Sequence, residues 1–169
     1  MNHHAVLDSP LGPLTLVEED GALVGVYMAD QRHRPDQTAH GDRDDDVLPA
    51  AREQLAAYLA GTLQTFDLPV RLRGTPFQQR VWAALRTIPY GQTWSYGRLA
   101  AAIGQPTASR AVGLANGRNP VGIVVPCHRV VGSTGSLTGY GGGVERKRWL
   151  LDHERAQASP AELRSAGDA

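Results

Sequence analysis

Residues 95–116 read SYGRLAAAIGQPTASRAVGLAN, and this segment predicts two short helices joined by a tight turn. Ser95 is a typical N-cap, and apolar positions follow it at helical spacing. Residues 104–106 form the turn, and Thr107 is placed to cap a helix over residues 108–116. A helix, a glycine-containing turn and a second helix make up the helix-turn-helix pattern, although many helical hairpins bind no DNA.

The second of these helices is unusual in composition, because small residues dominate positions 111–117. Small side chains let a helix backbone approach closely whatever it faces. Tight packing against another helix and insertion into a narrow minor groove of DNA would both use such a surface, and the composition leaves both open. In a groove, Arg110 would be the one long cation able to reach in.

A further helix is predicted upstream of this unit. Thr75 is a typical N-cap, Pro76 takes the favoured first helical position, and residues 89–91 break the helix. The buried side of the helix is predicted from apolar residues at helical spacing: Phe77, Val81, Trp82, Leu85 and Ile88.

The N-terminal part of the chain has a different sequence pattern, in which segments with β-strand propensity alternate with turn residues. Apolar segments at 5–7, 14–17 and 23–28 predict strands, and Asp20-Gly21 is a hairpin signal between the last two. This part therefore begins as a small antiparallel sheet.

Three more elements complete the prediction for the N-terminal part. Residues 47–59 carry apolar positions at helical spacing, and Gly61 ends that helix. Residues 66–72 alternate in polarity like a strand. Residues 30–46 are polar, charged and without aromatic side chains, which is typical of a mobile loop.

Charge is distributed very unevenly along a chain whose formal net charge is zero. Residues 1–70 carry a balance of −8, residues 71–155 one of +9, and residues 156–169 one of −1. Such asymmetry suggests that the basic part meets a polyanion such as nucleic acid. The alternative is a solubilising acidic domain beside a basic domain that binds nothing.

Composition sets the broad class. The chain has 169 residues, of which 41% are hydrophobic and 20% charged, so wholesale disorder is excluded. No stretch has the length of apolar sequence that a membrane helix needs, and the first residues do not resemble a secretory signal. A single cysteine excludes an internal disulfide and a zinc site built from several thiolates. We therefore expect a cytoplasmic protein without a metal.

The only cysteine stands in a chemically suggestive setting. An apolar, strand-like run ends at Pro126, and Cys127-His128-Arg129 follows directly. A lone cysteine is most often a small buried hydrophobe. Here, however, cationic neighbours would lower the pKa of the thiol, and the histidine could accept its proton. Adjacent side chains on a strand point to opposite faces, so a shared site requires a turn at Pro126 or a bridging water.

These residues and their surroundings resemble the O6-alkylguanine-DNA alkyltransferases, also called methylated-DNA–protein-cysteine methyltransferases. The resemblance covers residues 75–155 and extends more weakly to the N-terminal part. Its strongest motifs, in the family's order and at similar spacing, are residues 110–113, 119–120, 126–129, 139–142, 149–151 and 153–154.

The resemblance implies an α+β fold in two domains. A small antiparallel sheet with a helix (residues 1–73, with the mobile loop 30–46) would pack on a mainly helical, helix-turn-helix or winged-helix-like domain (residues 74–155), followed by a tail (residues 156–169). It also implies the function: the protein would flip O6-alkylguanine out of duplex DNA and transfer the alkyl group irreversibly to its own cysteine, once per molecule.

Five residues receive catalytic roles from the resemblance. Cys127 would accept the alkyl group, His128 would draw off the thiol proton through a water, and Glu154 would hold the imidazole. Asn119 would brace the turn between the recognition helix and the active site. Tyr96 would donate a hydrogen bond to the base as negative charge builds on it.

The resemblance also implies contacts with DNA and with the flipped base. Arg110 would fill the place that the base vacates. The recognition helix would use six residues: Thr107, Ser109, Arg110, Ala111, Gly113 and Arg118. Phosphates would be held by candidate arginines: Arg98, Arg118, Arg129 and Arg148. Val130, Tyr140 and Gly141 would form the pocket, where the carbonyls of Cys127 and Val130 accept from the guanine amino group and the Gly141 N–H meets O6.

Several alternatives stay open at this level. Glu154 could be solvated, Tyr96 could be a core residue, and residues 146–148 could be a solvated basic face. The glycines at 139–143 could form an ordinary loop. At the level of function, the rivals are a non-catalytic alkyltransferase-like DNA-binding module and a cysteine hydrolase. We expect a monomer without a cofactor, with double-stranded DNA as its partner, bound in the minor groove with little sequence specificity.

Overall fold

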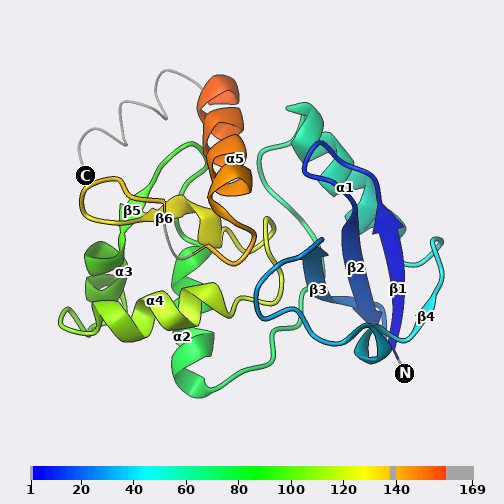
Figure 1. The fold of residues 1–169 in the computed structure, drawn as a ribbon, viewed down its shortest axis with the longest axis horizontal. Helices are drawn as coiled ribbons and strands as arrows, with labels where there is room; N and C mark the ends of the chain where they lie inside the picture. Colours follow the sequence, from blue (N-terminus) through cyan, green and yellow to red (C-terminus); the bar gives the residue numbers. More distant parts are fainter. Residues whose placement is uncertain (1, 138–139, 159–169) are drawn as a thin grey trace. The chain divides into compact units, whose positions relative to one another are not determined.

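Two structural units make up the computed structural model, which describes residues 2–137 and 140–158 (Figure 1). The first unit comprises residues 1–73 and 120–124, and the second comprises residues 74–119 and 125–169. The sequence placed residues 120–124 with the second unit. They join the first because the Val26 amide donates to the Pro120 carbonyl and Val26 forms a parallel bridge with Val121.

A four-stranded sheet forms the centre of the first unit. Strands β1 (Asn2–Leu7), β2 (Leu14–Glu19) and β3 (Ala22–Met28) are antiparallel neighbours, as predicted. The β2–β3 hairpin turns at Asp20-Gly21, where both residues have positive φ angles, 51° and 81°. A two-residue turn of this kind follows the right-handed twist of the strands, which is why the Asp-Gly pair predicts it.

Two predictions for the first unit were wrong in detail. Residues 66–72 form no strand, and Val70 alone makes a bridge, to Leu23 of β3. Pro69 lies next to the bridge and has no N–H to continue a ladder. The predicted loop 30–46 holds a 3-10 helix, η1 (Gln37–His40), and a short strand, β4 (Asp42–Arg43), which pairs with β1 in parallel. The sheet is therefore mixed at one edge.

Helix α1 (Pro49–Ala60) is the helix of the first unit. It begins two residues later than the apolar pattern suggests, because Leu48 has a left-handed backbone conformation, with φ at 53°. It ends at Gly61, as predicted, where a φ of 86° suits glycine. Ala51, Leu55 and Tyr58 are among its buried residues.

The second unit is mainly helical. It contains α2 (Pro76–Leu85), α3 (Tyr96–Ala102), α4 (Ser109–Gly117) and α5 (Val144–Gln157). Short parallel strands β5 (Trp94–Ser95) and β6 (Val130–Val131) pair beside them, and Cys127–Arg129 form one turn of 3-10 helix, η2. The predicted α+β class is confirmed.

Capping residues explain where these helices start. Thr75 caps α2 and Ser95 caps α3, both as the sequence predicts, and the Ser95 hydroxyl accepts from the Arg98 amide. Gln78 completes a capping box with Thr75, which the sequence analysis did not anticipate. Thr107 is not a cap, because α4 starts one residue late, with Ala108 as N-cap and no side-chain hydrogen bond. The Trp82 indole N–H donates to the Ala115 carbonyl at 2.9 Å and ties α2 to α4, so the helix-turn-helix α3–α4 rests on a buried aromatic residue.

Across residues 2–137 and 140–158 we find no helical segment with the length and apolarity that a membrane crossing needs. Residues 159–169, most of the predicted tail, lie outside the described residues, whereas residues 156 and 157 still belong to α5.

Candidate active site

The turn after Pro126 brings cysteine and histidine onto one local element. Cys127 and His128 are consecutive residues of η2, where successive side chains diverge by about 120° and not by the 180° of a strand. Cys127 is a free thiol with 7% of its surface exposed, and His128 is completely buried. Of the two arrangements that the sequence left open, a turn at Pro126 or a bridging water, the turn is present.

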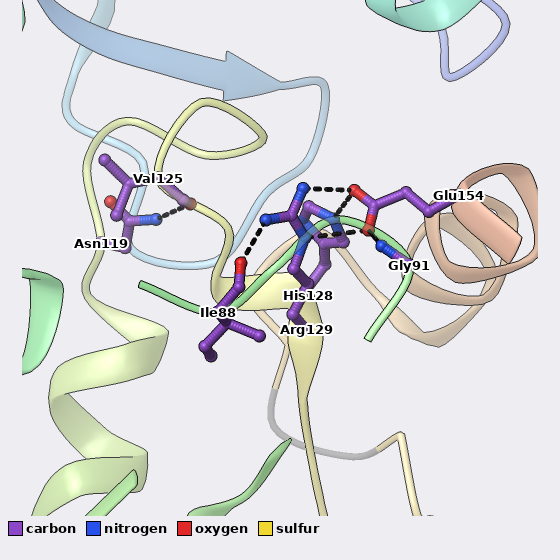
Figure 2. A network of polar contacts seen from close by, with 7 residues as sticks. All are labelled: Ile88, Gly91, Asn119, Val125, His128, Arg129 and Glu154. Atoms are coloured by element: carbon purple, nitrogen blue, oxygen red, sulfur yellow. Dashed lines mark hydrogen bonds and ion pairs between the residues drawn. The ribbon is translucent and has the colours of Figure 1, made fainter. Parts of the chain in front are cut away.

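His128 is held by Glu154 of α5 (Figure 2). Its Nε2 lies 2.7 Å from a Glu154 carboxylate oxygen, and both side chains are buried. Because a carboxylate only accepts, Nε2 carries the ring hydrogen in this pair and Nδ1 keeps its lone pair. Among the described residues, Nδ1 has no hydrogen-bond partner. Burial lowers the pKa of His128, which favours this neutral form.

Glu154 is the centre of a buried network and not a solvated residue (Figure 2). It is 1% exposed, and its carboxylate also accepts from Arg129 Nε at 2.8 Å, from Arg129 Nη2 at 3.0 Å and from the Gly91 amide at 3.3 Å. Burial alone would raise the pKa of Glu154. The hydrogen bonds from His128 and Arg129 and the charge of Arg129 nevertheless hold that pKa well below its usual range.

Arg129 was predicted to hold a phosphate, and that prediction is wrong. Its side chain is buried, with two donors on Glu154 and Nη1 on the Ile88 carbonyl at 2.7 Å (Figure 2). A buried guanidinium whose three nitrogen atoms all donate to groups in the interior is not placed to hold a phosphate. Its role is to fix the carboxylate that fixes the imidazole.

The expected effect of the neighbouring cations on the thiol is also wrong. Burial raises the pKa of Cys127, and a hydrogen bond from Asn119 and the charge of Lys147 only oppose that rise. Arg129 is neutralised by Glu154, and His128 is uncharged, so neither supplies the predicted cationic field. The resting thiol is protonated, and an acceptor for its proton is needed at the moment of reaction.

Lys147 of α5 is a site residue that the sequence analysis missed. It is fully buried, its ammonium group donates to the Val130 carbonyl, and it lies 5.8 Å from the centre of the Tyr140 ring. Burial lowers its pKa to about 8, and Cys127 opposes that shift. The sequence did contain a signal: Lys147 shares the helical face of three buried residues, Leu150, Leu151 and Glu154.

The other predicted catalytic residues belong to the same unit. Asn119 is buried, and its Nδ2 donates to the Val125 carbonyl at 2.8 Å, which braces the segment that leads to Cys127. Tyr96 is half-buried at the start of α3. Burial and the proximity of Cys127 raise the pKa of Tyr96, and a hydrogen bond from the Asn116 side chain lowers it.

The predicted pocket residues differ in exposure. Tyr140 is 4% exposed, and burial raises its pKa well above the ordinary value. The Val130 carbonyl already accepts from Lys147, and the Cys127 carbonyl accepts from the Val130 amide and from Asn116 Nδ2, so each offers limited capacity to a guanine amino group. Gly141 is half-buried, and Gly139 of the same motif lies outside the described residues.

The predicted DNA-binding residues lie on α4 and at its two ends, and most of them are exposed. Thr107, Arg110, Ala111 and Arg118 are exposed, and Ser109 and Gly113 are partly exposed. Leu114, which the sequence analysis did not single out, is 70% exposed one helical turn after Arg110. Elsewhere in this unit Arg148 is exposed, and Arg98 is exposed with its guanidinium 4.6 Å from the centre of the Trp94 ring.

Within the described part of the chain, no three histidine, cysteine, aspartate or glutamate side chains are grouped so that they could hold a metal ion.

Comparison with known families defines the class of protein. Residues 76–156 match the 6-O-methylguanine DNA methyltransferase DNA-binding domain, and residues 2–72 match the ribonuclease-like domain of the same family. The chain belongs to the 6-O-methylguanine DNA methyltransferase family, so the resemblance noted from the sequence is confirmed.

Individual relatives agree along nearly the whole chain. The methylated-DNA–protein-cysteine methyltransferase of Mycobacterium bovis is 55% identical, with 96% of this chain and 98% of the relative covered. The constitutive enzyme of that name from Bacillus subtilis is 44% identical, with 92% and 96% covered. The crystal structure of Mycobacterium tuberculosis OGT in complex with DNA matches with a TM-score of 0.88 at 54% identity, covering 95% of this chain and 97% of that one.

Proposed function

We propose that this protein repairs DNA by transferring the alkyl group of O6-alkylguanine to the sulfur of Cys127, once per molecule. The observation that carries the proposal is the 2.7 Å contact between His128 Nε2 and Glu154, which leaves the Nδ1 lone pair as a base in the turn that bears the thiol. The names of its relatives and their DNA complex support the same activity.

The reaction is a displacement at an sp³ carbon. The Cys127 sulfur forms a bond to the alkyl carbon while the bond from that carbon to guanine O6 breaks, and its electron pair stays on the base. The thiol proton passes to His128 Nδ1 and replaces the alkyl group on the guanine in the end. Glu154 stabilises the transient imidazolium, and Arg129 holds the Glu154 carboxylate in place so that the ring does not turn.

The raised pKa of Cys127 explains why a base is needed and also limits side reactions. A protonated thiol on a residue with 7% of its surface exposed is a poor target for adventitious electrophiles. The product is a thioether, and among the described residues no second nucleophile stands in the network to remove it. The protein is therefore consumed by one transfer.

DNA binding completes the proposal. The exposed small residues of α4 lie in the minor groove, Arg110 replaces the flipped nucleotide in the stack, and Arg98, Arg118 and Arg148 hold phosphates without reading sequence. The protein acts as a monomer and, because its thiol must stay reduced, in the cytoplasm.

Intact-mass measurement after incubation with a duplex containing O6-methylguanine tests the function. We expect a stable gain of one methyl group in place of a hydrogen on the wild type and none on Cys127→Ala. A methyl group released into solution would indicate a hydrolase. Binding of the damaged duplex without any change in mass would indicate a non-catalytic module, and either result would contradict the proposal.

A further inference from the structure

Asn116 is a buried polar residue that the reaction described above does not use. It lies on α4 with 1% of its surface exposed, and its Nδ2 donates to the Cys127 carbonyl at 3.3 Å. Its Oδ1 has no hydrogen-bond partner among the described residues. A buried amide with one unsatisfied oxygen is costly for folding, so a packing role alone does not explain an asparagine at this position.

The Tyr96 ring packs against the same face of α4. A methyl group added to Gly113 would lie 3.7 Å from two carbons of the Tyr96 ring, in ordinary contact, so the ring lies across this glycine. Asn116 follows Gly113 by three residues and therefore occupies the same side of the helix. From there its side chain forms a hydrogen bond with the Tyr96 hydroxyl.

The orientation of the amide decides what Tyr96 can do. Asn116 presents Nδ2 to the Cys127 carbonyl, which can only accept. Because Oδ1 has no hydrogen-bond partner among the described residues, the hydrogen bond between Asn116 and Tyr96 is donated by Nδ2 to the phenolic oxygen. The Tyr96 hydroxyl therefore does not donate its proton to Asn116. A hydroxyl that accepts one hydrogen bond is a stronger donor in the next.

We infer that Asn116 is a positioning residue for the alkyl transfer, because it orients the Tyr96 hydroxyl as a donor to the departing base and ties it to the Cys127 backbone. The inference rests on the proposed function and adds to it a link between the recognition helix and the leaving group. Donation by Tyr96 matters most when the bond to guanine O6 breaks, because negative charge then builds on the base.

A double-mutant cycle tests this role. The single-turnover rate of alkyl transfer from saturating O6-methylguanine duplex is measured for the wild type, Asn116→Leu, Tyr96→Phe and the double variant. We expect Asn116→Leu to slow transfer by about tenfold, the cost of one hydrogen bond lost in the transition state. We also expect the double variant to react no more slowly than Tyr96→Phe, because Asn116 acts through the Tyr96 hydroxyl.

Alkylation of Cys127 by iodoacetamide is the matched control. No base departs in that reaction, so Asn116→Leu should slow it far less than it slows alkyl transfer. A wild-type rate of transfer in Asn116→Leu, additive effects in the double variant, or an equal loss of iodoacetamide reactivity would each overturn the inference. If Asn116→Leu does not fold, Asn116→Asp has the same size without the two donors and is measured in the same way. Failure of the wild type to transfer would refute the proposed function itself, so the two failures are distinguishable.

Discussion

Glu19 and Glu154 each meet two basic side chains, but their surroundings differ. Glu19, in the first unit, pairs with Arg71 at 3.5 Å and with Arg73, and these two arginine side chains are 45% and 68% exposed. Glu154, in the second unit, is 1% exposed and accepts hydrogen bonds from His128, Arg129 and Gly91. Water screens the first cluster, whereas the second must satisfy every charge internally.

The difference shows how an ion pair becomes functional. The Glu19 cluster can rearrange at little cost, so it determines no geometry. The Glu154 network cannot lose Glu154 or Arg129 without leaving an unpaired buried charge, and it holds His128 in one orientation and one tautomer. Burial, and not the number of partners, separates a solvated pair from part of an active site.

Glu154→Gln disrupts the buried network and should have the largest effect on both alkyl transfer and stability. Without the carboxylate, His128 loses its orientation and Arg129 is left as an unpaired buried charge. We expect single-turnover alkyl transfer to fall by about 10²–10⁴-fold and the free energy of unfolding to fall by about 3–5 kcal/mol. Quenched-flow transfer assays and urea denaturation measure the two effects.

Glu19→Gln is the matched control for that variant. It removes one carboxylate that also meets two basic side chains, and we expect the free energy of unfolding to change by no more than about 1 kcal/mol. Transfer should keep the wild-type rate. Equal losses in the two variants would show that the buried network has no special role.

Lys147 sharpens the comparison because it is a buried cation that donates to the Val130 carbonyl and, among the described residues, forms no ion pair with a carboxylate. Its pKa of about 8 lies below the ordinary value of 10.5, so between these values the unfolded state binds more protons and stability should rise with pH. We expect a rise of about 3 kcal/mol at most, and its loss in Lys147→Met. Urea denaturation between pH 7 and pH 10.5 measures it, and an unchanged slope in the variant would contradict the assignment.

The dependence of stability on acidic pH should also differ between Glu154 and Glu19. The pKa of Glu154 is held below its usual range in the folded protein, so the unfolded state takes up protons first as the pH falls. The contribution of Glu154 is fully present above about pH 5, and we expect on the order of 2 kcal/mol to be lost below it. Denaturation as a function of pH should show a shallower acid limb for Glu154→Gln than for Glu19→Gln.

Exposed side chains of the two units give the smallest expected effect. Leu114 of α4 is 70% exposed beside Arg110, and contact with a groove wall would bury it. Leu114→Ala should weaken binding to undamaged duplex by about fivefold, with an unchanged dependence on salt because no charge is lost. Arg71→Gln in the first unit should leave the affinity unchanged. Fluorescence anisotropy at several salt concentrations checks both, and a change in salt slope for Leu114→Ala would argue against an apolar contact.

Local signals made much of the fold predictable. Asp20-Gly21 specified its hairpin, Thr75 the start of α2 and Gly61 the end of α1, because each acts on the backbone within a few residues. Segments whose partner lies far along the chain were predicted less well. Residues 66–72 meet β3 at a single bridge, and residues 120–124 join the first unit.

Residues 126–129 were enough to predict a nucleophilic cysteine beside a histidine base, because residue types and their order can be read without knowledge of the fold. Burial could not be deduced in the same way. It arises when distant elements close over a side chain, and it turned Arg129 from a phosphate ligand into a partner of Glu154, placed Lys147 in the interior and made the Cys127 thiol less acidic. The sequence by itself therefore determined which reactive side chains are present. Their protonation states and ion pairs were decided by the tertiary structure, because it determines which groups are removed from water.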